Sequence, residues 1–353
     1  MSMKPLDLES ARKILDFSGG DPSLANLGEL QLKGAVALHN MIADPKIGMA
    51  YLADEVGMGK TYVALGVVSL MRYFDPSVRV LYICPSNNVQ DKWFSREYRS
   101  FCKKNIRVNQ FRIRTIDGKP AAPRISCRNV PDLILNASSG YYADFFVGMS
   151  SFSLHLSEDE QTWTKKLEEL KTILPALELS KIGKSKKSVK DQFALALNYV
   201  LPTFDLVIID EAHKFKHDFS SSDRNYVLSK ALGFGEDGNF VKRVKHALLL
   251  SATPYDRDIN QLRNQLKLVG HGQLLPQDIS DKEKDRIEAH LSRFLVRRLN
   301  CLQIAGKPYT RNMYRREWRQ GDKAEIKLET DEQKLVTALV QKKVGEMLEK
   351  KGS

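Results

Sequence analysis

Apolar residues along the chain form short continuous runs that alternate with longer segments of helical spacing. The runs are rich in β-branched and aromatic residues, which predicts buried strands at 47–52, 78–84, 145–149, 206–209 and 246–250. Apolar positions three or four residues apart predict amphipathic helices at 24–42, 61–74, 86–101, 192–199, 256–268 and 278–293. Strands that alternate with helices predict an α/β fold, with a mostly parallel, doubly wound sheet and helices on both faces.

Other segments have weaker patterns. We expect a small N-terminal helix and loop, a further strand at 106–113, a helical insertion segment at 158–179 and a C-terminal helix at 331–351. Residues 114–139 are rich in Pro, Gly, Arg and Asn and predict a long irregular loop, and 181–190 form a lysine-rich hinge. We therefore expect an N-terminal extension (1–24), a main domain (25–299, with an insertion at about 114–200) and a basic connector with a C-terminal helix (300–353).

The segment 53–61, ADEVGMGKT, lies between the first strand and the second helix. A glycine-rich turn that opens a helix directs backbone N–H groups and the positive end of the helix dipole toward one point, which suits a polyphosphate. Lys60 supplies a charge for the β- and γ-phosphates, and the Thr61 hydroxyl suits Mg²⁺. The general pattern G-x-x-x-x-G-K-[ST] has glycine where this chain has Asp54. We expect ATP and Mg²⁺ to contact Asp54, Glu55, Val56, Gly57, Met58, Gly59, Lys60 and Thr61.

Two acids, Asp210 and Glu211, follow the fourth apolar run, at the edge where open parallel sheets bind ligands. We expect Asp210 to hold Mg²⁺ and Glu211 to orient or deprotonate the water that attacks the γ-phosphate. A charged helix N-terminus would explain the two acids alone, and a lone His213 is ambiguous. Ser251 and Thr253 follow the next strand, and their hydroxyls suit hydrogen bonds that link the carboxylates to a neighbouring surface.

Composition narrows the class of partner. A net charge of +12 favours a polyanion, with nucleic acid first and an anionic membrane second. No apolar run approaches the roughly 20 residues that span a bilayer, and the N-terminus lacks the apolar core of a signal peptide, so we expect no membrane association and a cytoplasmic location, at the nucleoid if the chain binds DNA. The four cysteines include no C-x-x-C pair, which indicates neither a disulfide framework nor a zinc site.

Seven motifs, in family order, resemble the first ATPase lobe of the superfamily-two helicases and translocases, in particular the Swi/Snf-like branch and its bacterial relatives. Asp54 belongs to that branch's phosphate loop, LADE-x-G-x-GKT, and Gln31 and Gly34 sit where the adenine-side motif belongs. The later motifs are CPSNNVQDKW, VGMSSF, IIDEAHKFK (the DEAH box), LLLSATP and FLVRRL. The resemblance covers residues 24–299 and implies a RecA-like P-loop NTPase lobe in which Lys60, Asp210 and Glu211 are catalytic. It also implies coupling through His213, Ser251 and Thr253, and nucleic-acid contacts through Pro85, Ser86, Ser150 and Ser151.

The resemblance further implies a second RecA-like lobe that supplies arginine fingers, and we find no matching motif after the arginine pair. We expect a partner subunit or a longer chain to supply that lobe, and slow hydrolysis by this chain alone. Arg315 and Arg316, beside Tyr314 and Trp318, are candidates for further nucleic-acid contacts, although a solvated surface explains these residues equally well. A translocase or remodeller on double-stranded DNA is the favoured function, and an RNA-directed helicase or an ATP-gated protein-interaction module remain alternatives.

Overall fold

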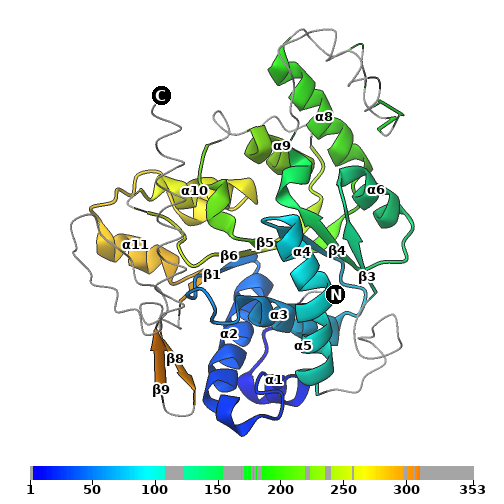
Figure 1. The fold of residues 1–353 in the computed structure, drawn as a ribbon. Coiled ribbons are helices and arrows are strands. Elements are labelled where there is room, and N and C mark those ends of the chain that lie inside the picture. Colours follow the sequence, from blue (N-terminus) through cyan, green and yellow to red (C-terminus); the bar gives the residue numbers. More distant parts are fainter. Residues whose placement is uncertain are drawn as a thin grey trace, which may run out of the picture. The chain divides into compact units, whose positions relative to one another are not determined.

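Seven parallel strands form the central sheet, in the order β3-β4-β2-β5-β6-β1-β7 (Figure 1). The strands are β1 (Met49–Leu52), β2 (Val80–Cys84), β3 (Arg124–Cys127), β4 (Asp144–Gly148), β5 (Phe204–Asp210), β6 (Val244–Leu250) and β7 (Leu295–Val296). The computed structural model describes residues 3–107, 123–153, 185–218, 223–234, 240–256, 258–297, 301–304 and 307–310, with a few residues between 168 and 180. All of these belong to one unit of the chain, Met1–Arg311.

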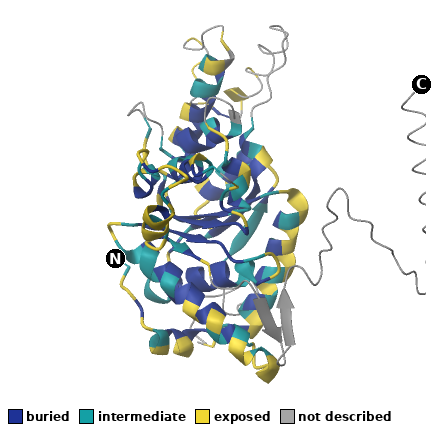
Figure 2. Cartoon of the chain, turned by 90° about the vertical axis from the view of Figure 1, so that its left-hand side faces the viewer, coloured by how far each residue is buried: buried dark blue, intermediate teal, exposed yellow. Residues whose placement is uncertain are grey.

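Helices cover both faces of the sheet. One face packs against α1 (Leu8–Ile14), α2 (Ala25–Ala43), α3 (Lys60–Phe74), α4 (Asn87–Asp91) and α5 (Tyr98–Lys104). The other packs against α6 (Val130–Ser138), α8 (Lys186–Val200), α9 (Asp223–Ala231), α10 (Asn260–Leu268) and α11 (Lys284–Leu291). Successive strand residues point to opposite faces, so Ala50 and Leu52 join one apolar core while Met49 and Tyr51 join the other. The strands are therefore buried on both sides (Figure 2).

A buried ion pair joins the helix that follows β1 to the start of β4. The guanidinium of Arg72, in the last turn of α3, donates to both carboxylate oxygens of Asp144 at 2.8 and 2.9 Å, and to the Val78 carbonyl. The Tyr98 hydroxyl donates to Asp144 at 2.5 Å. Burial lowers the pKa of Arg72, but the charge of Asp144 more than offsets this effect and the pKa is raised. The pair is therefore ionised and excluded from water, with α3, α5 and β4 held together by its hydrogen bonds.

The helical run after β2 changes its geometry part-way. Ser86 caps α4, because its hydroxyl accepts a hydrogen bond from the Val89 N–H. The run then continues as a π-helical segment, η2 (Lys92–Glu97), before α5 begins. Wider π turns are rare and occur mainly at functional sites. Here the change of pitch turns Trp93 inward, where it is buried.

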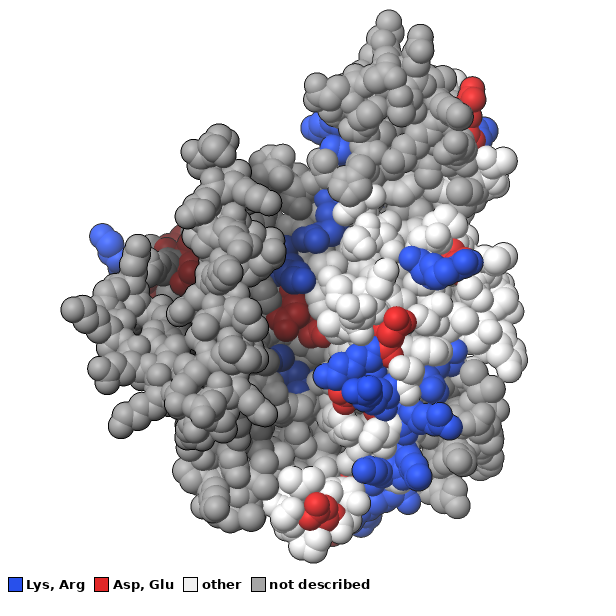
Figure 3. Space-filling model, viewed as in Figure 1, with Lys and Arg blue, Asp and Glu red and all other residues white. Residues whose placement is uncertain are grey.

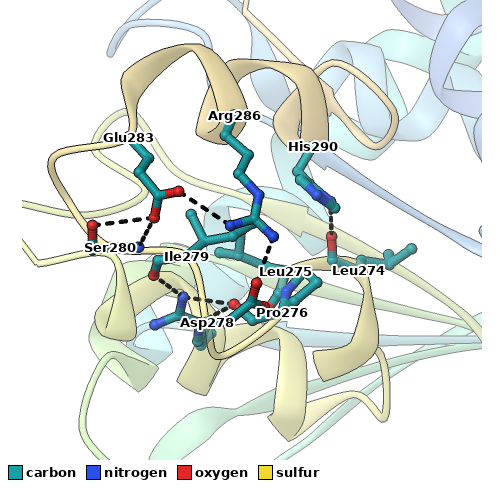
Figure 4. A network of polar contacts seen from close by, with 10 residues as sticks. Leu274, Leu275, Pro276, Asp278, Ile279, Ser280, Glu283, Arg286 and His290 are labelled. Carbon is teal, nitrogen blue, oxygen red and sulfur yellow. Dashed lines mark hydrogen bonds and ion pairs between the residues drawn. The ribbon is translucent and has the colours of Figure 1, made fainter.

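Polar contacts hold the segment that leads from α10 to β7 (Figure 4). The Arg263 guanidinium, on α10, donates to the carbonyls of Leu275, Pro276 and Ile279. On α11, Arg286 forms ion pairs with Asp278 and Glu283. Because this segment is fixed, β7 can add to β1 at the edge of the sheet, where Tyr51 pairs with Leu295. After β7, strands β8 (Cys301–Ile304) and β9 (Lys307–Thr310) form a separate antiparallel pair.

The structure confirms the predicted fold class and the five central strands, and it corrects several local predictions. The prediction of an irregular loop at 114–139 is wrong for the residues that the structure describes there. Asn129 caps α6, and β3 adds a strand to the sheet. The last two helices of the main domain are shorter than predicted. Ile106 forms an isolated bridge with Leu15, and residues 108–113 of the strand predicted at 106–113 lie outside the described residues. The helix at 331–351, most of the segment at 158–179 and residues 181–184 of the lysine-rich hinge also lie outside them, while 186–190 of that hinge belong to α8. The domain limits stay a prediction.

His271 lies where the strands of the sheet begin, opposite their carboxyl ends. It is buried next to Gly48 and His246. Burial and the nearby Lys242 lower the pKa of His271 to about 4. An unfolded chain would protonate this ring near the ordinary histidine value of roughly 6.5. The folded state therefore loses stability as the pH falls from about 6.5 toward 4, because the unfolded state binds the proton first.

We predict that Arg72→Met lowers the free energy of unfolding by about 3–5 kcal/mol, because the substitution leaves the Asp144 carboxylate buried without its cation. Urea unfolding at neutral pH measures the change. Arg12→Met is the matched control, since Arg12 forms an exposed ion pair with Glu29 and should change stability much less. Equal effects of the two substitutions would contradict this account of the buried pair.

We predict that His271→Gln flattens the pH dependence of stability between pH 6.5 and 4. The wild type should lose up to about 3 kcal/mol more than the variant over this range, at about 1.4 kcal/mol per unit of pKa difference. Urea midpoints at several pH values measure the slope. His217→Gln removes an exposed histidine and should leave the slope unchanged. A parallel pair of curves for wild type and His271→Gln would refute the prediction.

Candidate nucleotide-binding site

The glycine-rich loop closes against α2. Gly57 and Gly59 have φ angles of +84° and +79°, in the left-handed region that glycine adopts without strain. A Cβ atom on Gly59 would lie 2.3 Å from Nε2 of Gln31, and this Nε2 donates to the Met58 carbonyl at 3.2 Å. Gln31 thus lies against the loop, as predicted for an adenine-side residue. Its amide holds the loop backbone, a contact that the spacing alone did not indicate.

Lys60 lies at the centre of the loop, at the first position of α3. Its ammonium donates to the carbonyls of Asp54 and Glu55 at 2.9 and 3.2 Å. Burial lowers the pKa of Lys60, and the charges of Glu211, Asp210, Asp54 and Glu55 oppose that effect. The structure therefore brings the lysine of the loop and the two acids at the end of β5 within electrostatic reach of one another.

The acids at the end of β5 have different surroundings. The side chain of Asp210 accepts two hydrogen bonds, from the Glu211 N–H at 2.9 Å and from Nε1 of Trp93 at 3.2 Å. Burial and the neighbouring charge of Glu211 raise the pKa of Asp210 to about 6. Glu211 has φ 52° and ψ 49°, the only positive φ of a non-glycine residue in the described part of the chain. Strained backbone of this kind is typical of functional sites.

His213 links Glu211 to the end of β6. Its Nδ1 lies 3.2 Å from Oε2 of Glu211 and 2.9 Å from Oγ of Ser251. The hydrogen bond from His213 is the main cause of a lowered pKa of Glu211, which keeps this carboxylate ionised. Thr253 contributes its backbone N–H, which donates to Oγ of Ser251 at 3.2 Å, while its side chain is exposed. The three residues expected to couple the site thus meet, although Thr253 does so through its backbone.

Two contacts near the carboxyl ends of the strands were not predicted from the sequence. Arg297, directly after β7, forms an ion pair with Glu55 of the loop at 3.1 Å. The Tyr51 hydroxyl on β1 donates to Gln265 of α10 at 2.7 Å, and Gln265 in turn donates to the Pro254 carbonyl. The residues are more than 200 positions apart in each of the long-range pairs. Only the order of strands in the sheet brings them together.

The residues predicted to contact nucleic acid lie at the ends of the paired strands β2 and β4. Ser86 and Ser150 are exposed, and Pro85 and Ser151 are partly exposed. A Cβ atom on Gly148 would lie 3.0 Å from Oδ1 of Asn87 and 3.6 Å from Oγ of Ser150, so the start of α4 adjoins the turn after β4. On the face shown in Figure 3, acidic side chains lie in a central hollow and basic side chains gather over α5. Arg315, Arg316, Tyr314 and Trp318 lie outside the described residues.

Among the described residues, no three or more His, Cys, Asp or Glu side chains are grouped so that they could hold a metal ion. No helix among these residues is long and apolar enough to cross a membrane.

Residues 30–256 match the family described as "Type III restriction enzyme, res subunit". The chain belongs to this family. The matched range contains the phosphate loop, both acids of β5, Ser251 and Thr253. It therefore contains nearly the whole of the site described above.

Among curated proteins, the chain is similar to the "Uncharacterized ATP-dependent helicase YqhH" of Bacillus subtilis (strain 168), with 34% identity over 145 residues. The match covers 36% of this chain and 23% of that protein. Two solved structures of the Sulfolobus solfataricus SWI2/SNF2 ATPase core, one in complex with dsDNA, have TM-scores of 0.44 and 0.42 and identities of 15% and 16%. These matches cover 77% and 78% of this chain, and 44% and 43% of the solved chains.

We predict that Gly59→Ala weakens binding of Mg-ADP, because alanine would strain the left-handed backbone and its Cβ atom would displace the Gln31 amide from the loop. Isothermal titration calorimetry should show one site in the wild type and a lower affinity in the variant. Gly140→Ala is the matched control, since Gly140 also has a positive φ but no atom within 4 Å of the added Cβ. Gly140→Ala should lose a little stability and bind Mg-ADP normally. If both variants lose binding, the cause would be backbone strain in general and not the contact with Gln31.

Proposed function

We propose that the chain contains the nucleotide-binding lobe of a nucleic-acid-dependent ATPase, which binds Mg-ATP and couples its hydrolysis to movement along nucleic acid, with double-stranded DNA favoured. One observation carries the proposal: the Lys60 ammonium lies inside a glycine-rich loop and within electrostatic reach of Asp210 and Glu211. A phosphate loop and an acid pair at one sheet edge are the parts that phosphoryl transfer to water requires. The Bacillus subtilis relative is named an ATP-dependent helicase, which supports the same activity.

Each residue of the site has a proposed role. The loop N–H groups and Lys60 would bind the phosphates, and the lysine would exchange its two carbonyl partners for phosphate oxygens. Glu211, held ionised by His213, would orient the attacking water and accept its proton. Ser251 would transmit changes at Glu211 to β6, because its hydroxyl bonds to His213.

The donor set fits Mg²⁺. Thr61 and Asp210 offer a hydroxyl and a carboxylate, which are hard oxygen ligands, and Mg²⁺ commonly takes one or two protein ligands with waters and substrate phosphates completing its shell. When bound, Mg²⁺ neutralises charge that develops on the phosphates. The role of the protein is to hold the Asp210 carboxylate in place, to which the Glu211 N–H contributes a hydrogen bond.

The residues on this edge would line one side of a bound nucleotide. The described arginine in contact with the loop, Arg297, is paired with Glu55. We propose that a second RecA-like lobe, in the same polypeptide or in a partner subunit, closes the other side and supplies an arginine to the γ-phosphate. Without that arginine, rates typically fall by about 10³ to 10⁵.

The nucleic-acid partner would lie across the ends of β2 and β4, against Ser86 and Ser150, with Arg315 and Arg316 as further candidates. The net charge of +12 supports a partner rich in phosphates. Contacts to a phosphate backbone carry no base information. Affinity should therefore be insensitive to sequence and should fall linearly in log K against log salt.

We predict that the chain alone releases phosphate from ATP slowly even with duplex DNA, because the arginine for the γ-phosphate would come from the second lobe. With that lobe present, duplex DNA should stimulate release, and Lys60→Ala should remove both basal and stimulated release. Lys46→Ala removes an exposed lysine outside the site and should behave as wild type. Single-stranded DNA and RNA are compared at equal phosphate concentration. Stronger stimulation by RNA than by DNA would show that RNA is the partner. Nucleotide binding with no response to any nucleic acid would favour an ATP-gated interaction module. Equal rates of the wild type and Lys60→Ala would refute an ATPase site at the loop.

A further inference from the structure

Trp93 makes a contact that none of the roles above explains. Its ring is 3% exposed, and its Nε1–H donates to Oδ2 of Asp210 at 3.2 Å. The other oxygen, Oδ1, accepts the N–H of Glu211 at 2.9 Å. An indole N–H is a donor only, so it cannot replace a metal ligand, but it fixes the oxygen that accepts it. Asp210 is thus held from two sides, and its remaining lone pairs are left for other partners.

The ring of Trp93 is itself immobilised. It packs against Tyr82 of β2 at a centroid distance of 5.9 Å, and Tyr82 stacks on Phe146 of β4 at 4.1 Å. The indole therefore rests on two neighbouring strands of the sheet. Its position along the helical run depends on the π-helical segment η2, which begins one residue before it.

The same helical run begins at the proposed nucleic-acid face. Ser86 caps α4 next to the turn after β4, and the run reaches Asp210 through Trp93 two turns later. A displacement at the start of α4 would therefore move the indole relative to the carboxylate. A π turn is rare within a helical run and occurs mostly at functional sites, which agrees with a connecting role for this run.

We propose that Trp93 is a positioning residue for the metal-holding carboxylate Asp210, and that it connects the start of α4 to the metal site. This inference rests on the proposed function, because it takes Asp210 as a ligand of Mg²⁺. Groups that orient a metal ligand typically change metal affinity by 10- to 100-fold when they are removed.

The test replaces Trp93 by Phe, which retains an aromatic ring but removes the N–H. Mg²⁺ affinity of the ADP complex should fall about 10-fold or more, measured with Mn²⁺ as the probe by electron paramagnetic resonance and with Mg²⁺ by competition. Binding of metal-free ADP should change less than about 2-fold, since a loss at that step would be a general structural effect. Tyr82→Phe is the matched control: it deletes a hydroxyl from the adjacent ring, leaves the indole donor in place and should not change metal affinity.

A second measurement keeps the test valid if Trp93→Phe does not fold. The chain has three tryptophans, at 93, 163 and 318, so Trp163→Phe/Trp318→Phe leaves Trp93 as the only indole. Its emission should shift when Mg²⁺ is added to the ADP complex, and return when the metal is chelated.

The outcomes separate the two proposals. Failure of the wild type to bind Mg-ADP would overturn the proposed function. Binding by the wild type with unchanged Mn²⁺ affinity in Trp93→Phe, an equal loss of metal-free ADP binding, or an emission indifferent to Mg²⁺ would overturn the role of Trp93 alone.

Discussion

The buried ion pair between Arg72 and Asp144 is the constraint on which the geometry of the nucleotide site depends. It holds the last turn of α3 to the first residue of β4, while the first turn of α3 carries Lys60 and Thr61. The near end of the same helix is held by Gly59 against Gln31. Because both ends are held, the direction of α3 relative to the sheet is determined, and so is the direction of the N–H groups that face the phosphates. The Arg72–Asp144 ion pair thereby determines the geometry of the nucleotide site, although it lies at the far end of α3.

At the carboxyl ends of the strands, hydrogen bonds link the ends of three neighbouring strands. Glu211 follows β5, His213 bridges to Ser251 after β6, and the Ser251 N–H donates to the Leu52 carbonyl at the end of β1. The phosphate loop starts at the next residue. Glu211 and the phosphate loop are therefore connected by a continuous line of covalent and hydrogen bonds. The left-handed backbone of Glu211 is what turns its side chain toward this line.

The sequence predicted those parts of the site that depend on local spacing. The loop at 53–61 and the acids at 210 and 211 each follow a buried strand, and the parallel sheet brings such strand ends to one edge. Contacts between residues far apart in the sequence could not be predicted, because no local pattern indicates them. Examples are the contacts of Arg297 with Glu55 and of Tyr51 with Gln265. Trp93 escaped because a π turn depends on packing rather than on periodicity. The strand β3 and helix α6 were missed since prolines and asparagines suggested a loop, although Asn129 and Pro131 are also ordinary helix-start residues.

The edge strand β7 is joined to the sheet by very few bonds. It pairs with β1 over two residues; the Val296 carbonyl accepts from the Ala53 N–H, and the carbonyl of Phe294, directly before β7, accepts from the Tyr51 N–H. Strands held this lightly open locally far more often than the whole protein unfolds. When β7 detaches, the Ala53 N–H loses its partner directly before the phosphate loop, and Arg297 is carried away from Glu55. Support of the phosphate loop from this side of the sheet thus depends on a strand of only two residues.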